Sequence, residues 1–178
     1  MEARSTAAVA FETRLGWMAI ARRGDSVAGL TIGHGGPAAA WKAIREMLGE
    51  VDEELAESDP LIADLKAYAA GEPVSFDGVP LDVKHLTSFQ RRVVRQCRRV
   101  DYSETLSYKQ LAQRAGSPGA ARAVGNTMAK NRFPIIVPCH RIVGSAGALG
   151  GFSAPQGISL KRRMLDMEAA AAPALLPS

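Results

Sequence analysis

The segment Thr105–Asn131, "TLSYKQLAQRAGSPGAARAVGNTMAKN", decides most of what the sequence predicts about the fold. Ser107, followed three residues later by a glutamine, forms a capping box and predicts the start of a short helix. Gly116 interrupts that helix, and Ser117 and Pro118 suit the cap and first position of a second one. Two short helices joined by a glycine-containing turn predict a helix-turn-helix.

The second of these helices has two different faces. Ala121, Val124 and Met128 are spaced as a buried stripe. The other side carries mostly small residues and one arginine: Gly119, Ala120, Arg122, Ala123 and Asn126. Small residues let a backbone approach a partner closely. This face therefore favours DNA contact over a plain helical hairpin within a core.

The charge distribution points the same way. Residues 1–83 hold 7 Lys and Arg against 14 Asp and Glu, whereas residues 84–178 hold 15 against 4. The formal net charge of +4 thus hides an acidic half of −7 and a basic half of +11. Such asymmetry suggests a polyanion-binding half joined to a supporting half, although a chance distribution of surface charge remains the alternative.

The pattern of the remaining chain predicts a mixed fold, α/β in the α+β sense. Residues 14–33 indicate two strands around a turn, and helices are expected after Pro37 and from Asp59 to about residue 70. These elements form a predicted N-terminal domain, 1–84, with a small antiparallel sheet. A mostly helical domain, 85–170, carries the helix-turn-helix, and 171–178 are a disordered tail.

The basic domain opens with a helix capped by Thr87 or Ser88. Phe89, Val93, Cys97 and Val100 share one apolar face of it, so Cys97 is interpreted as a small core residue.

The second cysteine lies in "NRFPIIVPCHRIVG", Asn131–Gly144. The flanking prolines predict an extended strand, 135–137, that delivers Cys139 to a fixed place. His140 and Arg141 follow directly, and an imidazole and a positive charge can both raise the thiolate fraction of a thiol. A Cys-His pair alone is a weak signal, but this delivery and the basic domain strengthen it.

Other classes of protein fit less well. Two scattered cysteines make no disulfide framework, and the three histidines lack metal-ligand spacing, so a metal site is not expected. "GHGGPA", Gly33–Ala38, matches a dinucleotide fingerprint in form, but too few residues follow it for a doubly wound sheet. Without a signal peptide or membrane span, we expect a monomeric, soluble, cytoplasmic protein, associated with the nucleoid in a bacterium or nuclear in a eukaryote.

Residues from about Phe89 to Glu168 resemble the O6-alkylguanine-DNA alkyltransferases, the methylated-DNA–protein-cysteine methyltransferases. The Pro-Cys-His-Arg core, the Arg-Ala-Val-Gly helix and the asparagine before the apolar run carry the likeness. The resemblance implies DNA repair by a suicide transferase. The alkyl group of O6-alkylguanine, or of O4-alkylthymine, would move to the protein in one turnover after the base is flipped out of double-stranded DNA. It implies no cofactor.

The resemblance also implies a role for each site residue. Cys139 would accept the alkyl group, and His140 would take the thiol proton through a water. Glu168 would polarise His140, and Asn131 would brace the site. Tyr108 would donate a hydrogen bond to the base. Arg122 would fill the gap in the duplex, and the expected DNA contacts are Arg122, Ala121, Ala123, Ser117, Thr127 and Arg141. The expected base pocket consists of Val137, Pro138, Gly150, Phe152 and Ser153.

Two departures from the family pattern stand out. Phe152 occupies a position where the family commonly has tyrosine, and the loop "FSAPQGIS" is about two residues longer than usual. Two alternative functions stay open. One is a non-catalytic lesion binder, although known binders of that type lack the cysteine; the other is a helix-turn-helix regulator with a sensing thiol.

Overall fold

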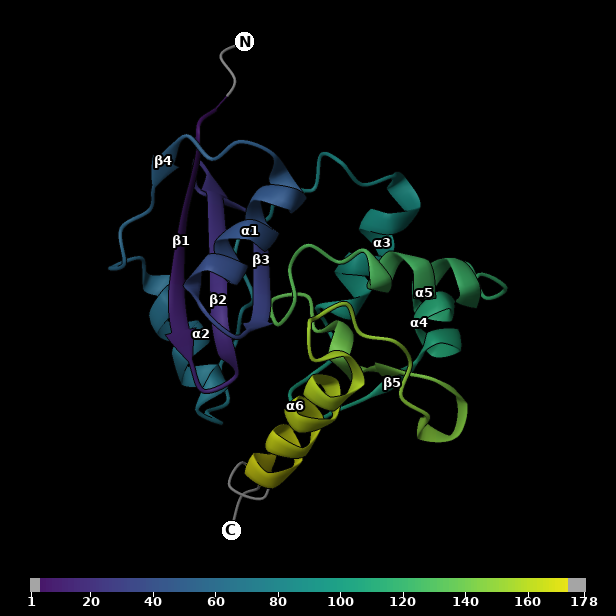
Figure 1. The fold of residues 1–178 in the computed structure, drawn as a ribbon. Helices are drawn as coiled ribbons and strands as arrows, with labels where there is room; N and C mark the ends of the chain where they lie inside the picture. The colour runs from purple at the N-terminus through teal and green to yellow at the C-terminus, as the bar shows by residue number, and fades with distance from the viewer. Residues whose placement is uncertain (1–3, 173–178) are drawn as a thin grey trace. The chain divides into compact units, whose positions relative to one another are not determined.

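The structure is a computed structural model and describes residues 4–172. By its internal contacts the chain divides into two compact units, residues 4–83 with Ala154–Gln156 and residues 84–153 with 157–172. The first unit contains a sheet with two helices and the second is mostly helical (Figure 1), which confirms the predicted mixed class. None of the helices within residues 4–172 has the length and apolar character needed to cross a membrane.

The first unit is built on a four-stranded sheet in the order β3-β2-β1-β4. β1 (Thr6–Thr13), β2 (Gly16–Arg23) and β3 (Ser26–His34) pair antiparallel, and the short β4 (Glu53–Glu54) runs parallel to β1. The sequence predicted β2 and β3 with the turn between them but missed β1. Several of the residues in β1 are alanines, whose low strand propensity makes the strand hard to predict from the sequence.

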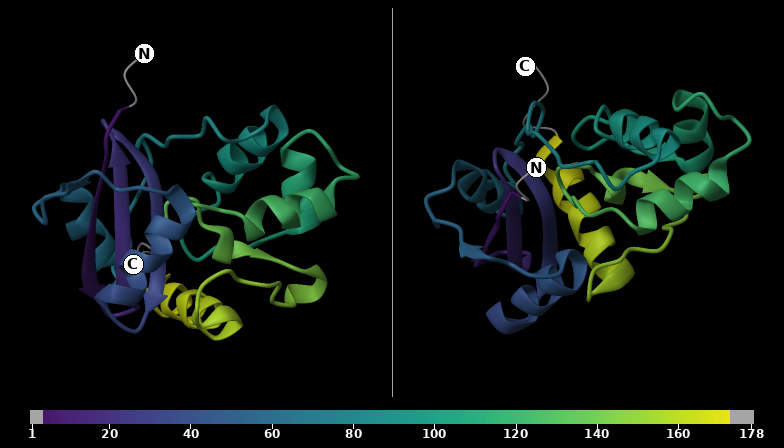
Figure 2. Two further views of the ribbon diagram at one scale, coloured as in Figure 1. Left: turned by 45° about the horizontal axis from the view of Figure 1, so that its top comes forward. Right: turned by 90° about the horizontal axis from the view of Figure 1, so that it is seen from above.

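Two helices cover opposite faces of this sheet (Figure 2). α1 (Pro37–Leu48) packs on a face made largely of alanines. It lies close to Gly29, where a Cβ would be 2.7 Å from the Sδ of Met47. α2 (Pro60–Ala69) begins as predicted, because the Asp59 carboxylate accepts a hydrogen bond from the Leu61 amide at 3.0 Å.

The second unit contains the elements that carry the candidate site. They are α3 (Ser88–Cys97), β5 (Leu106–Ser107), α4 (Tyr108–Arg114), α5 (Ala121–Ala129), η1 (Cys139–Arg141), β6 (Ile142–Val143), η2 (Ser145–Gly147) and α6 (Gly157–Ala171). β5 and β6 pair parallel, with Leu106 opposite Ile142. This pairing places the first residue of α4 beside the segment that follows η1.

Local sequence signals fixed the starts of α3 and α4. The capping box predicted at Ser107 is present, and Thr87, one of the two caps expected for α3, forms another. In each box the hydroxyl of the capping residue accepts a hydrogen bond from the glutamine amide three residues on, and the glutamine side chain accepts one from the amide of the capping residue. On α3, Cys97 is fully buried, and burial raises the pKa of its thiol well above the usual value. Its interpretation as a core residue is confirmed.

The predicted start of α5 was wrong. The helix begins at Ala121 rather than at Pro118, and Ala120 is its N-cap without a side-chain hydrogen bond. The amide of Ser117 instead donates to the Ala112 carbonyl at 2.9 Å, while Gly116 has a φ of +80°. These bonds close the C-terminus of α4 in the manner of a Schellman motif, so Ser117 belongs to the end of one helix and not to the start of the next.

The predicted strand at 135–137 was also wrong. Ile135 has a φ of +73°, and the Val137 amide donates to the Phe133 carbonyl at 2.8 Å, so the chain turns here. The left-handed conformation is costly for a β-branched residue, and burial of the apolar side chains in the core holds it. At the other end of the unit, the expected tail begins within α6, which includes Ala171; residues 173–178 lie outside the described residues.

Candidate active site

Cys139 is the first residue of the one-turn helix η1, which packs against α6. Only 7% of the residue is exposed. Burial raises the pKa of its thiol; a hydrogen bond with Asn131, the charge of Lys161 and nearby backbone amides lower it, and the net direction is upward. The resting sulfur is therefore a thiol at neutral pH, and it needs a base to become a nucleophile.

His140 and Glu168 supply a base and its anchor. Nε2 of His140 lies 3.0 Å from Oε1 of Glu168, and both side chains are completely buried. Burial lowers the pKa of His140, although Glu168 opposes that shift. The imidazole is thus neutral at pH 7 and able to accept a proton. Because Nε2 is engaged by the carboxylate, Nδ1 is the ring nitrogen left for a proton from the thiol.

A guanidinium cation binds the same carboxylate. Arg141 donates to Glu168 through Nη2 at 2.6 Å and through Nε at 3.0 Å, and its Nη1 donates to the Val100 carbonyl at 2.8 Å. Burial would raise the pKa of Glu168, but the hydrogen bonds from His140 and Arg141 lower it to about 2. Glu168 is therefore a permanent anion, ready to stabilise an imidazolium.

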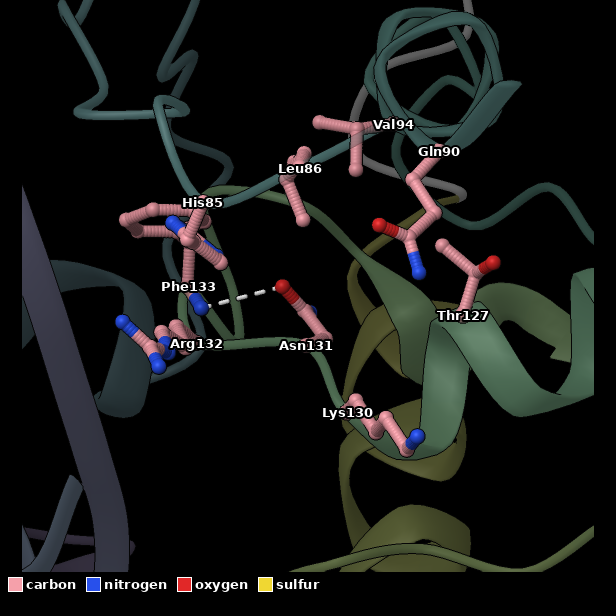
Figure 3. A pocket seen from close by; sticks show the side chains of 9 residues that line it. All are labelled: His85, Leu86, Gln90, Val94, Thr127, Lys130, Asn131, Arg132 and Phe133. Carbon is pink, nitrogen blue, oxygen red and sulfur yellow. Dashed lines mark hydrogen bonds between the residues drawn. The ribbon is translucent and has the colours of Figure 1, made fainter. Parts of the chain in front are cut away.

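Asn131 braces the turn before the thiol with both ends of its amide. Nδ2 donates to the Val137 carbonyl at 2.9 Å, and Oδ1 accepts from the Phe133 amide at 2.9 Å. Figure 3 shows the second bond at the edge of a cavity of about 170 Å³, lined by residues of α3, α5 and the segment after α5. Cys139 does not line this cavity, so we do not assign the acceptor site to it.

Tyr108 and the loop 144–153 form another side of the site. Burial raises the pKa of the Tyr108 phenol, so it stays protonated. The phenol lies against Gly150 so closely that a Cβ on this glycine would overlap the hydroxyl. Phe152 is half-buried, and the exposed Ser153 donates to the Ala129 carbonyl of α5 at 2.6 Å. Among the expected pocket residues, Val137 and Pro138 are buried.

The expected DNA contacts divide into two groups. Arg122 and Ala123 are exposed on α5, and Ser117 and Ala121 are half-buried. Two other expectations do not hold: Arg141 is inside the unit, bound to Glu168, and Thr127 is buried with its hydroxyl donating to the Ala123 carbonyl. The sequence showed their chemistry but not the direction in which each side chain points.

Sequence reasoning missed Lys161. It lies on α6 beside two exposed arginines and entered the sequence analysis only through the net charge of the basic half, yet it is only 1% exposed. Its spacing of three from Met164 and seven from Glu168 could have revealed it, because that is the spacing of a buried helical stripe. Within residues 4–172, no group of three His, Cys, Asp or Glu side chains is arranged to hold a metal ion.

Comparisons with known proteins agree with this geometry. Residues 88–170 match the family profile described as 6-O-methylguanine DNA methyltransferase, DNA binding domain. The crystal structure of the Mycobacterium tuberculosis O6-methylguanine methyltransferase has a TM-score of 0.75 and 32% identity over 93% of each chain. The chain belongs to the methylated-DNA–protein-cysteine methyltransferase family.

Two further relatives of the methyltransferase family show how far the likeness extends. A protein of that name from Mycobacterium bovis is 47% identical over 110 residues, which are 62% of this chain and 64% of that protein. The sequence match thus spans just under two thirds of this curated relative. A crystal structure of the Mycobacterium tuberculosis protein in complex with DNA has a TM-score of 0.74 and 32% identity over 92% of each chain.

The methyltransferase profile covers the part of the chain that carries the site. Tyr108, Asn131, Cys139, His140 and Glu168 all fall within the matched residues. Family membership therefore applies to the unit that contains the Cys139 thiol and the pair of His140 and Glu168.

Proposed function

We propose that this protein repairs DNA by transferring the alkyl group of an O6-alkylguanine to the Sγ of Cys139, once per molecule. The observation that carries the proposal is a thiol on the residue that precedes a neutral histidine, whose imidazole is anchored on a buried carboxylate. This arrangement can create a thiolate on demand, and the unit that contains it also presents a helix-turn-helix.

The transfer begins with ionisation of the thiol. His140 accepts the proton through a water, and Glu168 stabilises the imidazolium that results. The thiolate then attacks the alkyl carbon: a carbon–sulfur bond forms, the bond from carbon to O6 breaks, and the electron pair stays on the guanine. A protonated Tyr108 is suited to donate a hydrogen bond, and then a proton, as negative charge develops on the base.

The product explains why one turnover is expected. A thioether is a poor leaving group at neutral pH, and the chain needs no cofactor for the transfer itself. The alkylated sulfur therefore stays alkylated, and the protein is consumed in the reaction.

Access to the alkyl group requires the nucleotide to leave the duplex. Extruding a base costs a few kcal/mol, and this cost must be offset by contacts between protein and DNA. Arg122 projects from the exposed side of α5 between small residues, which suits a side chain that fills the gap in the base stack. The net charge of +11 over residues 84–178 would supply sequence-independent affinity that falls with salt.

The test is intact-protein and peptide mass after mixing the chain with a duplex that contains O6-methylguanine. We expect one methyl group on the peptide that carries Cys139, none on the peptide that carries Cys97, and no transfer by Cys139→Ser. The matched control is Cys97→Ser, which should keep transfer. DNA binding without any transfer would refute the proposal and would favour a lesion binder. Binding to one operator sequence only would favour a regulator.

A further inference from the structure

Lys161 is a buried lysine that has no role in the transfer steps described above. Its Nζ donates to the Ile142 carbonyl at 2.7 Å and lies 5.9 Å from the centre of the Tyr108 ring. Ile142 comes three residues after the thiol, and Tyr108 is the proposed proton donor. A buried lysine is rare because desolvation disfavours its charge, so its position calls for a compensating interaction.

No carboxylate compensates it in the part of the chain that the structure describes. The buried anion of the site, Glu168, is bound by His140 and Arg141 instead. Two other titratable groups interact with the thiol, Tyr108 from α4 and Cys97 from α3, and burial raises the pKa of both, so both are neutral. Tyr102, before β5, lies against Arg141, and burial raises its pKa as well. His140 is neutral as well, because burial lowers its pKa.

The charges around the sulfur therefore nearly cancel, with one exception. Glu168 and Arg141 neutralise each other through two hydrogen-bonding nitrogens of the guanidinium. The ammonium of Lys161 remains, held by a neutral carbonyl and a neutral ring. Among the described residues, a thiolate at Cys139 would be the only full negative charge available to compensate the ammonium of Lys161.

We propose that Lys161 is the positioning residue that stabilises the thiolate of Cys139 before alkyl transfer. This inference rests on the proposed function and identifies a residue that stabilises the charge of its nucleophile. Lys161 exchanges no proton and forms no bond to the substrate. Its charge makes proton transfer from the thiol to His140 more favourable, and its contact with the Tyr108 ring holds the proposed donor in place.

The electrostatic effects of the two groups are reciprocal. Burial raises the pKa of the Cys139 thiol, and the charge of Lys161 opposes that shift. Burial lowers the pKa of Lys161, and a thiolate at Cys139 opposes that shift. Once the sulfur carries an alkyl group, it can no longer ionise. No thiolate can then form to act as the counter-ion of Lys161 at alkaline pH, so Lys161 should release its proton more easily.

The first experiment measures the rate of Cys139 alkylation by iodoacetamide against pH in the full chain, with the modified peptide identified by mass. For Lys161→Met, which keeps length but not charge, we expect the midpoint to rise by about one pH unit and the rate at pH 7 to fall about tenfold. The rates of wild type and variant should converge above both midpoints. Lys161→Arg should stay within about threefold of wild type at pH 7.

Arg162→Met is the matched control, because it removes an exposed cation from the next position of α6. It should leave the midpoint unchanged. An unchanged midpoint in Lys161→Met would overturn the proposal, and so would an equal loss of rate at every pH, which would indicate a purely structural role.

A second measurement needs no variant that might fail to fold. Nuclear magnetic resonance of labelled lysine side chains in the wild-type chain gives the midpoint of Lys161 before and after Cys139 is alkylated. We expect the midpoint to fall after alkylation, and an unchanged midpoint would overturn the proposal. Neither experiment uses DNA. If the chain takes no methyl group from DNA but both midpoints shift as expected, the proposed function is refuted and the effect of Lys161 on the thiol still stands.

Discussion

Replacing Glu168 by glutamine tests the buried charge network most directly. The carboxylate is completely buried and binds His140 and Arg141 at distances from 2.6 to 3.1 Å. Glutamine keeps the shape but removes the charge, which leaves the guanidinium in the interior without an anion. Truncating one partner of a buried pair typically costs about 3–5 kcal/mol, because the other charge stays uncompensated.

The pKa of Glu168 gives a second estimate of the same cost. Its pKa falls from 4.5 to about 2 on folding, and this difference corresponds to about 3 kcal/mol of stability. Because the folded pKa is the lower one, this contribution is complete above the unfolded value and is lost as pH falls toward the folded value. Between pH 7 and pH 3.5, wild type should lose about 1–2 kcal/mol through this group alone, and Glu168→Gln should not.

Urea unfolding of wild type, Glu168→Gln and Asp166→Asn at both pH values would check this reasoning. Asp166 is exposed on the same helix, so its variant should stay close to wild type. We expect Glu168→Gln to be about 3 kcal/mol less stable at pH 7, with the gap to wild type narrowing at pH 3.5. A variant within about 1 kcal/mol of wild type at pH 7, or a gap independent of pH, would show that Glu168 does not carry the buried charge as argued.

Three further changes have definite expected outcomes. Gly150→Ala should slow single-turnover transfer, since its Cβ would displace the Tyr108 hydroxyl; Gly151→Ala has open space around its Cβ and should react at the wild-type rate. Arg122→Ala should slow transfer from duplex DNA roughly 10- to 100-fold and leave the rate on single-stranded DNA unchanged, as measured by gel-based kinetics. An equal loss of rate on both substrates would contradict a role in base flipping. Ser107→Ala should lower the free energy of unfolding in urea by about 1 kcal/mol through loss of the cap on α4, and no loss would mean that the hydrogen bond to the Gln110 amide contributes little.

Short-range patterns in the sequence predicted the parts of the fold that depend on neighbouring residues. The capping residues of α2 and α4 were predicted, and that of α3 was narrowed to Thr87 or Ser88, because each cap bonds to an amide two or three residues away. The position of Cys97 in the core followed from helical spacing. The resemblance placed His140 and Glu168 together although they are 28 residues apart, and no local pattern could have done so.

Other features depended on contacts that no local pattern encodes. The chain bends at Ile135 because Asn131 bonds to both ends of the turn, while the prolines on either side suggested an extended strand. The side chain of Arg141 points into the unit because it binds the carboxylate of Glu168 on α6. Lys161 is buried, with its Nζ bonded to the Ile142 carbonyl and close to the Tyr108 ring.

The sequence by itself determined β2, β3 and the helices α1 to α4, since these rest on the chemistry of adjacent residues and on the periodicity of strands and helices. The resemblance, rather than any local pattern, singled out Cys139 as the proposed nucleophile. Only the tertiary structure decided which cations face the thiol and which face solvent. Arginine and lysine have long side chains that serve either role, and the choice depends on which distant carboxylate, carbonyl or ring the folded chain brings within reach.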